Sequence, residues 1–227
     1  MAIARIAGLF AGHVESFVAA DGQPMTSAIR KRPLAEAWLG PSGFTGDESA
    51  EAGHHTADRD VHVFAEENYA AVETLVGRAL PRPAFGENLT ATGLGDDDVH
   101  VGDCYAIGDA VICVTQPTER CRSIGRHVGL PKILKALHEL EVCGFYARVV
   151  REGRVTRDDS ITLTERPPKA WSIRRLHRAM FEEHLDQAVV ADILAIAQLS
   201  REWKDRFLVL RGRHARGEPL NSSLAEL

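Results

Sequence analysis

Cys121 is the residue of this sequence best suited to do chemistry. It follows the apolar run from Val111 to Thr115, which places it in a loop where a strand ends, and Arg120 and Arg122 flank it. Neighbouring cations favour the thiolate, the form that attacks electrophiles and binds soft metals. The remaining cysteines lie in apolar or strand-like stretches, where a thiol is usually a small buried hydrophobic group; they are Cys104, Cys113 and Cys143. Cys121 is therefore the candidate nucleophile or metal ligand.

Composition limits the partners that this protein can have. A chain of 227 residues can form one large domain, or a domain of about 150 residues with a small appendage. Its net charge of −5 creates no general basic field for nucleic acid, and no stretch is long and apolar enough to span a membrane. We therefore expect a small-molecule substrate, with neither nucleic acid nor membrane as a partner.

The N-terminus and the cysteines predict a compartment. The first ten residues read as a strand and lack the long apolar core of a secretory signal. Four unevenly spaced cysteines in a chain of this length do not suggest a disulfide framework. We therefore expect a cytoplasmic protein whose thiols are reduced.

Two regions with different patterns follow each other along the chain. Up to about Arg166, short apolar runs alternate with Gly-, Pro- and Asp-rich turns, which is typical of a β-barrel or β-sandwich. The expected strands are Ile3–Phe10, Asp60–Phe64, Cys104–Ile107, Ala110–Thr115, Phe145–Val150 and Ser160–Leu163, and the expected helices are Glu66–Val76 and Pro131–Glu139. The first region is thus predicted to be a mainly β domain.

The second region begins after the double proline Pro167-Pro168 and is helical. Three apolar stripes at helical spacing each follow a capping residue, namely Ser172, Asp186 and Ser200. The fold class is accordingly α+β, mainly β, with a barrel-like domain over residues 1–166, a three-helix domain over 170–212 and a flexible polar tail over 213–227. The three-helix domain is either packing material or an interaction module, and it is a candidate element for a homodimer.

Several segments, taken in order, resemble the MOSC (molybdenum cofactor sulfurase C-terminal) family in its YiiM-like branch. These segments are Ser27–Lys31, Gly46–Glu51, His55 with Asp58-Arg59, Phe85–Leu89, Gly93-Leu94, Val101–Asp103, Gln116-Pro117 ahead of Cys121, and Gly144–Val149. The Phe-Gly-Glu-Asn-Leu segment and the placed cysteine are the most specific of them. The three-helix region also matches the small C-terminal domain of this branch, so the resemblance covers nearly the whole chain.

The resemblance implies a MOSC β-barrel-like domain whose cleft binds a molybdenum–pterin cofactor, with Cys121 as the thiolate ligand of the metal. It further implies an enzyme that reduces N-hydroxylated or related N-oxygenated compounds to amines. A flavin or iron–sulfur reductase would be the separate electron donor, because this chemistry needs a cofactor that cycles between oxidation states.

Matched positions receive hypothetical roles from the same resemblance. The residues implied to bind the cofactor are Lys31, Asp58, Arg59, Gly86, Asn88 and Gln116. His55 and Glu87 are implied to take part in catalysis, as groups that donate or relay a proton. Structural roles compete with several of these assignments, since Asp58 and Arg59 could form an ion pair, Asn88 could cap a turn, and Lys31 could be a solvated surface charge.

Departures from the family pattern cluster at the expected cofactor cleft. The family's His-Gly-Gly-Pro-Asp-Arg is here the stretch His54–Arg59, without the glycines. Its Gln-Pro-Arg-x-Pro-Cys is here Gln116–Cys121, with Thr118 and Arg120 in place of the arginine and the second proline, and Thr26 stands where many members have lysine. The sequence is thus a divergent member at its cofactor motifs.

These departures leave other functions open. His54, His55, Asp58 and His62 could bind zinc or iron, although a strand starting near Asp60 would separate them. A cofactor-free protein could instead transfer sulfur through a Cys121 persulfide. A third alternative is a protein that binds or delivers the cofactor without turnover.

Overall fold

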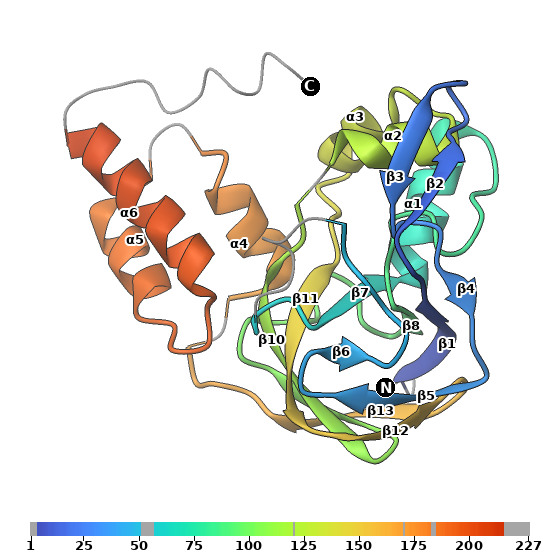
Figure 1. Cartoon of the computed structure of the whole chain (residues 1–227). Coiled ribbons are helices and arrows are strands. Elements are labelled where there is room, and N and C mark those ends of the chain that lie inside the picture. The colour runs from blue at the N-terminus through green and yellow to red at the C-terminus, as the bar shows by residue number, and fades with distance from the viewer. Residues whose placement is uncertain (1–3, 51–56, 120, 170, 183–184, 216–227) are drawn as a thin grey trace.

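A computed structural model describes residues 4–50, 57–119, 121–169, 171–182 and 185–215. It consists of a mainly β domain with three short helices on one side and three further helices beside it (Figure 1). The strands of the main sheet are β1 (Ala4–Ala11), β4 (Arg32–Pro33), β7 (Val61–Ala65), β8 (Leu89–Thr92), β9 (Cys104–Ile107), β10 (Ala110–Pro117), β11 (Phe145–Arg151) and β13 (Ser160–Glu165).

The main sheet closes into a barrel. Its strand order is β13-β9-β10-β11-β7-β8-β1-β4, and an additional pairing of β13 with β1 joins the two sides. That pairing is antiparallel and matches Ala4 with Ile161 and Arg5 with Ser160. Closure removes the unpaired edges that an open sheet would expose. The short strand β4 extends the sheet from β1 at Phe10 and Ala11.

Two smaller sheets flank the barrel. A hairpin is formed by β2 (Glu15–Val18) and β3 (Pro24–Ser27), and a three-stranded sheet by β5 (Glu36–Gly40), β6 (Gly43–Phe44) and β12 (Gly153–Thr156). The hairpin projects beside the short helices (Figure 1).

The three short helices build a second core against the barrel. They are α1 (Glu66–Val76), α2 (Arg122–Val128) and α3 (Ile133–Glu139). Phe64 from β7 packs with Tyr69 of α1 and with Phe85, and the ring centroids lie 4.2 to 5.0 Å apart. Ile124 of α2 and Leu137 of α3 belong to the same buried cluster. This cluster holds α2, whose N-terminus follows Cys121, against the barrel.

The C-terminal helices form where their capping residues predict. They are α4 (Ile173–Ala179), α5 (Gln187–Leu194) and α6 (Arg201–Ala215). Ser172 accepts a hydrogen bond from the Arg175 amide at 3.3 Å, and Asp186 accepts one from the Ala188 amide at 2.8 Å. Ser200 likewise accepts the Trp203 amide at 3.2 Å. Each side chain satisfies an amide that the first turn of a helix leaves unpaired.

The helical domain and the barrel share one apolar core. Trp203 and Phe207 of α6 are almost fully buried and belong to the same cluster as barrel residues such as Ile112 and Val114. The backbone adds the bond from the Ser200 amide to the Thr115 carbonyl, at 3.2 Å. The two domains therefore pack as a single unit.

The predicted elements are largely confirmed. Helix α1 has the predicted bounds, β9 matches its prediction residue for residue, and the other five predicted strands differ by at most two residues at either end. One boundary is wrong, because α6 continues to Ala215 and so includes residues 213–215 of the predicted tail. The rest of that tail lies outside the described residues.

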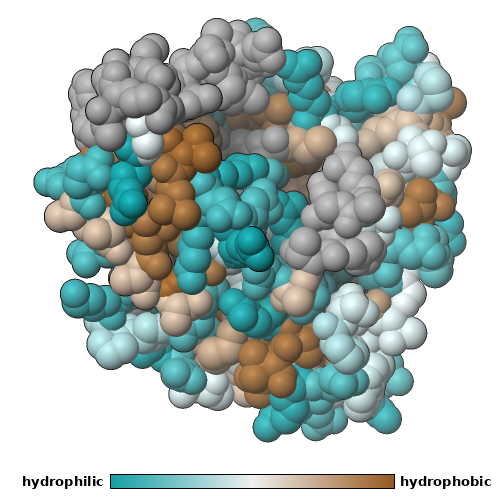
Figure 2. Space-filling view, turned by 60° about the vertical axis from the view of Figure 1, so that its left-hand side comes forward, coloured by the Kyte–Doolittle hydropathy of each residue, from teal (hydrophilic) through white to brown (hydrophobic). Residues whose placement is uncertain are grey.

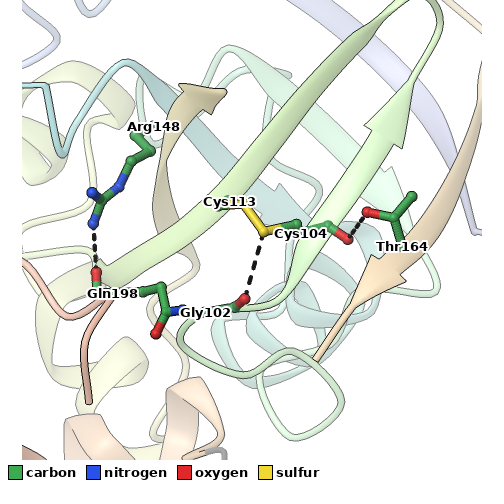
Figure 3. Close-up of a disulfide and its surroundings, with 6 residues drawn as sticks. All are labelled: Gly102, Cys104, Cys113, Arg148, Thr164 and Gln198. Atoms are coloured by element: carbon green, nitrogen blue, oxygen red, sulfur yellow. Dashed lines mark hydrogen bonds between the residues drawn. A yellow bond between two sulfur atoms is a disulfide. The ribbon is translucent and has the colours of Figure 1, made fainter. Parts of the chain in front are cut away.

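The expectation that all thiols are reduced is wrong for two of them. Cys104 and Cys113 face each other on β9 and β10, with Cα atoms 4.1 Å apart, and form a disulfide (Figure 3). Cys121 and Cys143 take part in no disulfide. The error has a physical reason: directly opposite residues of an antiparallel pair approach closely enough to bridge, and this pairing is decided by the turn between the strands.

On one face of the molecule, hydrophilic side chains extend across the middle and hydrophobic side chains form separate patches (Figure 2). Within the described part of the chain, every helix is too short or too polar to cross a membrane. The cytoplasmic location stays a prediction.

The disulfide generates a stability prediction. Replacing both cysteines, Cys104→Ser with Cys113→Ser, should lower the free energy of unfolding by about 2–3 kcal/mol, because a crosslink restricts the unfolded chain. Urea unfolding without reductant measures the difference. Reductant should produce the same loss in the wild type and none in the double variant. Four titratable thiols in denatured, unreduced wild-type protein would contradict the pairing.

Candidate functional site

A cavity of about 210 Å³ opens between the barrel, the short helices and the β2–β3 hairpin. Its walls come from segments that are distant in sequence, and they carry four of the polar side chains predicted to do chemistry, namely Lys31, Arg59, Asn88 and Cys121. The lining residues that matter for the argument are Lys31, Asp47, Arg59, His62, Cys121 and Tyr146.

Cys121 lies at the edge of this cavity with its thiol exposed to solvent. It caps helix α2, where its sulfur accepts a hydrogen bond from the Ser123 amide at 3.5 Å and lies 3.1 Å from the Ser123 hydroxyl. An exposed sulfur held on a helix cap can be reached by a metal or an electrophile, whereas Cys143 in the same wall is buried. Arg120 lies outside the described residues.

A buried ion pair forms one wall of the cavity. The ammonium group of Lys31, whose side chain is only 7% exposed, contacts the Asp47 carboxylate. Asp47 also accepts hydrogen bonds from the Gly12 amide at 2.9 Å and from the Asn88 amide group at 2.8 Å. Burial lowers the pKa of Lys31, although the Asp47 charge opposes this shift. Lys31 is thus not a solvated surface charge.

Asn88 uses its side chain to connect three parts of the site. Its carbonyl oxygen accepts the His62 amide at 3.0 Å, and its amide group donates to Asp47 and to the Phe10 carbonyl, at 2.8 and 3.3 Å. These bonds join β1, β7 and the Asp47 loop. The primary task of Asn88 is therefore to hold the cavity wall, and cofactor contact stays a prediction.

His62 presents an imidazole nitrogen without a protein partner. Its side chain lines the cavity, and its Nε2 atom is buried with no hydrogen-bond partner among the residues that the structure describes. Burial, with a smaller contribution from the Lys31 charge, lowers the pKa of His62 to about 3, and a hydrogen bond with the Gly86 backbone opposes this shift in part. His62 is therefore neutral at physiological pH, and a buried polar atom of this kind calls for a ligand or water.

Arg59 reaches the cavity from the loop before β7. Its guanidinium lies 5.3 Å from the centre of the Tyr146 ring and pairs with Glu202 of helix α6. The ion pair between Arg59 and Asp58, considered as the structural alternative, does not form, because Asp58 pairs with Arg148 at 3.3 Å. Asp58 does not line the cavity.

The segment Phe85–Leu89 contributes backbone rather than charge. Gly86 lines the cavity with a left-handed φ of 76°, which favours glycine, and a Cβ there would lie 3.2 Å from Ile29. Glu87 is fully buried and accepts hydrogen bonds from the Tyr69 hydroxyl and the Phe85 amide, at 2.5 and 3.1 Å. Burial raises the pKa of Glu87. Because Glu87 does not line the cavity, its contacts with Tyr69 and Phe85 support a structural role, and its part in catalysis stays a prediction.

The remaining predicted residues fall outside the cavity wall or outside the described residues. The Gln116 side chain is fully buried without lining the cavity, and neither of its polar atoms has a hydrogen-bond partner among the described residues. His54 and His55 lie outside the described residues. The part of the chain with assigned positions contains no cluster of three or more side chains suited to bind a metal ion, so the zinc or iron alternative stays untested at His54 and His55.

The structure adds residues to the site that sequence reasoning missed. Asp47 lies in the matched segment Gly46–Glu51, where an acid directly after a glycine is a usable signal. Tyr146 stands in another matched segment, and burial raises its pKa to about 12. No local sequence pattern indicates that Ser123 or Glu202 of α6 belongs to the site, because their contacts with Cys121 and Arg59 form only when the chain is folded.

Comparisons with known proteins agree with this architecture. A family model described as the MOSC domain matches residues 50–162, and one described as a YiiM-like, 3-alpha helix domain matches residues 171–208. The protein YflK of Bacillus subtilis (strain 168) is 32% identical over 195 residues, which are 85% of this chain and 88% of that protein.

Two further matches concern function and fold. A protein named reductase from Gibberella moniliformis (strain M3125 / FGSC 7600) is 28% identical over 213 residues, which are 90% of this chain but only 36% of that protein. The crystal structure of YiiM from Geobacillus stearothermophilus superposes with a TM-score of 0.77 at 28% identity, covering 91% of this chain and 98% of that one.

His62 generates a prediction for acid stability. Its folded-state pKa lies below the ordinary 6.5, so the unfolded chain binds the proton first as pH falls, and stability is lost from about pH 6.5 downward towards pH 3. Between pH 7 and pH 5 this costs about 2 kcal/mol. The His62→Gln variant should lose that much less than the wild type, as measured by urea unfolding at both pH values. An equal loss in both proteins would contradict the assignment.

Proposed function

The chain belongs to the MOSC domain family, in the branch with a YiiM-like three-helix domain, and from this premise we propose that it is a molybdenum-cofactor-dependent oxidoreductase. Its proposed substrates are N-hydroxylated or related N-oxygenated small molecules, which it would reduce to amines. The observation that carries the proposal is the exposed Cys121 sulfur at the edge of a polar cavity. The similarity to the fungal reductase supports oxidoreductase chemistry over binding alone.

Four groups of the cavity support the proposal. A thiolate is a good ligand for a thiophilic metal, and Cys121 offers the exposed sulfur. The unpartnered Nε2 atom of His62 provides a hydrogen-bond acceptor inside the cavity, and Lys31 provides a buried cation for an anionic group. The backbone at Gly86 lets a flat ligand approach closely.

When bound, the cofactor supplies the two-electron change of oxidation state that no side chain can provide. The chain would hold it through Cys121, with Lys31, His62 and Gly86 along the wall. Reduction of R–NHOH to R–NH₂ and water takes two electrons and two protons, and the electrons would come from a separate flavin or iron–sulfur reductase. Lys31 holds protons at Nζ, and because burial lowers its pKa, it releases one more readily than an exposed lysine does.

A second function shares the same sulfur. Cys121 is exposed and not tied into a disulfide. Its thiolate could attack the outer sulfur of a persulfide donor R–S–SH, forming Cys121–S–SH while the donor S–S bond breaks and R–S⁻ leaves. An acceptor thiolate R′–S⁻ would then take that outer sulfur as R′–S–SH and return the Cys121 thiolate. This alternative needs neither the Lys31–Asp47 pair nor the unpartnered His62 nitrogen. The cofactor-dependent enzyme is the proposal that uses all of these groups.

Metal and pterin content tests the proposal directly. Protein purified from a host that makes the cofactor should contain molybdenum and pterin near one per chain, and Cys121→Ala should lose at least 90% of the molybdenum. Cys143→Ala removes a buried thiol from the wall of the same cavity and is the matched control, which should keep its content. Elemental analysis and fluorescence of the oxidised pterin give the two readouts.

Activity completes the test. With a hydroxylaminopurine base as substrate and a reduced viologen dye as electron donor, the wild type should form the amine and Cys121→Ala should be at least 100-fold slower. Wild-type protein without molybdenum and pterin would overturn the proposal, and sulfane sulfur on Cys121 would then favour sulfur transfer. Bound cofactor without turnover of N-hydroxylated compounds would favour a binding protein.

A further inference from the structure

Four charged side chains form a closed ring where helix α6 meets the barrel. Arg59 contacts Glu202, and its Nη2 atom lies 3.8 Å from Glu119 Oε1. Arg206 contacts Glu119 and donates to Glu202 Oε1 at 3.0 Å. Each carboxylate therefore lies within ion-pair distance of both guanidinium groups. Burial and the neighbouring Glu202 raise the pKa of Glu119, and the charges of Arg206 and Arg59 oppose this shift. Arg59 is only 6% exposed, so its charge depends on these partners.

The ring has two members on each side of the domain junction. Arg59 and Glu119 belong to the barrel domain and line the cavity, and Glu119 lies two residues before Cys121. Glu202 and Arg206 stand one turn apart on α6 and do not line the cavity. The helical domain thus contacts the cavity wall through side chains that cannot themselves touch a ligand inside it.

The position of α6 relative to Cys121 is fixed by other contacts. The Ser200 amide before the helix bonds to the Thr115 carbonyl of β10, the strand that leads towards Cys121, at 3.2 Å. Arg148 of β11 donates to the Gln198 carbonyl at 2.7 Å (Figure 3). Trp203 and Phe207 anchor the helix in the shared core. These contacts therefore hold Glu202 and Arg206 of α6 at fixed positions relative to the barrel.

We propose that Glu202 and Arg206 are positioning residues, through which the three-helix domain holds Arg59 and Glu119, and with Glu119 the nearby Cys121, in the geometry of the cavity. Without Glu202, the buried Arg59 guanidinium, which faces the Tyr146 ring, would keep Glu119 as its one carboxylate partner among the described residues. The segment before Cys121 is anchored at Thr118, which donates to the Cys143 carbonyl, and Glu119 is its second anchor. The inference rests on Cys121 being the reactive sulfur of the proposed function, and it is independent of what that sulfur binds.

A charge exchange within α6 tests this role. Glu202→Arg with Arg206→Glu keeps the net charge and the pair one turn apart on the helix, but it places like charges against Arg59 and Glu119. Amide hydrogen exchange of the segment 117–123 should become at least tenfold faster. Alkylation of Cys121 by iodoacetamide, followed by peptide mass spectrometry at fixed pH, should become at least fivefold faster, because a mobile segment frees the sulfur from Ser123.

The same helix provides a matched control. Arg201 and Asp205 form an exposed pair one turn apart, with nitrogen and oxygen 3.8 Å apart, and Arg201→Asp with Asp205→Arg should leave both rates within twofold of the wild type. If the first exchange prevents folding, Glu202→Gln with Arg206→Gln removes the ring's α6 charges without repulsion and should accelerate both rates in the same direction.

Unchanged alkylation and exchange rates in the folded exchange variant, or in the neutral pair, would overturn the inference. Faster exchange throughout the helical domain without any change at Cys121 would also overturn it, because that result indicates a contribution to stability alone. Neither readout requires molybdenum, so a failure of the cofactor proposal would leave this test intact.

Discussion

Closure of the barrel at β1 is the constraint on which the site depends. This strand pairs with β8 along most of its length, with β13 at its start and with β4 at its end. A bulge between Ile6 and Gly8 shifts its register, and bulges re-aim the residues that follow them. The end of β1 then supplies the Phe10 carbonyl to Asn88, and the Gly12 amide just beyond it bonds to Asp47. The wall of the cavity is thus tied to the strand that closes the barrel.

Buried charges make the cavity polar and also make it demanding to build. A charge removed from water is tolerated when an opposite charge and hydrogen bonds replace the solvent. Lys31 satisfies this rule through Asp47, which is itself held by two amide donors. Arg59 satisfies it through Glu202 from the other domain. Among the described residues that line the cavity, His62 Nε2 and Arg59 Nε are buried nitrogens without a hydrogen-bond partner, and a ligand could donate a hydrogen bond to His62 Nε2.

The departures from the family motif near Cys121 have local explanations. Thr118 stands where the family has an arginine, and its hydroxyl donates to the Cys143 carbonyl while its amide bonds to Gly144. Thr118 therefore fixes the end of β10 to the Cys143–Gly144 backbone, whereas an arginine at this position would offer a cation to the cavity. The next residue, Glu119, brings a negative charge that two arginines neutralise. Arg59, which matches the arginine of the other family motif, lines the same cavity from a different loop.

The sequence by itself determined the elements with strong local patterns, together with the family and the candidate sulfur. Alternation predicted β7, and capping residues predicted the starts of α4 and α6, because these signals depend on neighbours within a few residues. Strands of two residues such as β4 were missed, since they are too short to carry a period, and the helix α2 was also missed. Three features could be seen only in the tertiary structure: the Cys104–Cys113 disulfide, the contacts of Asp47 with Lys31, Gly12 and Asn88, and the ring of four charges. Each joins residues through strand register or domain packing, so that the partner of Arg59 proved to be Glu202, 143 positions away, rather than its neighbour Asp58.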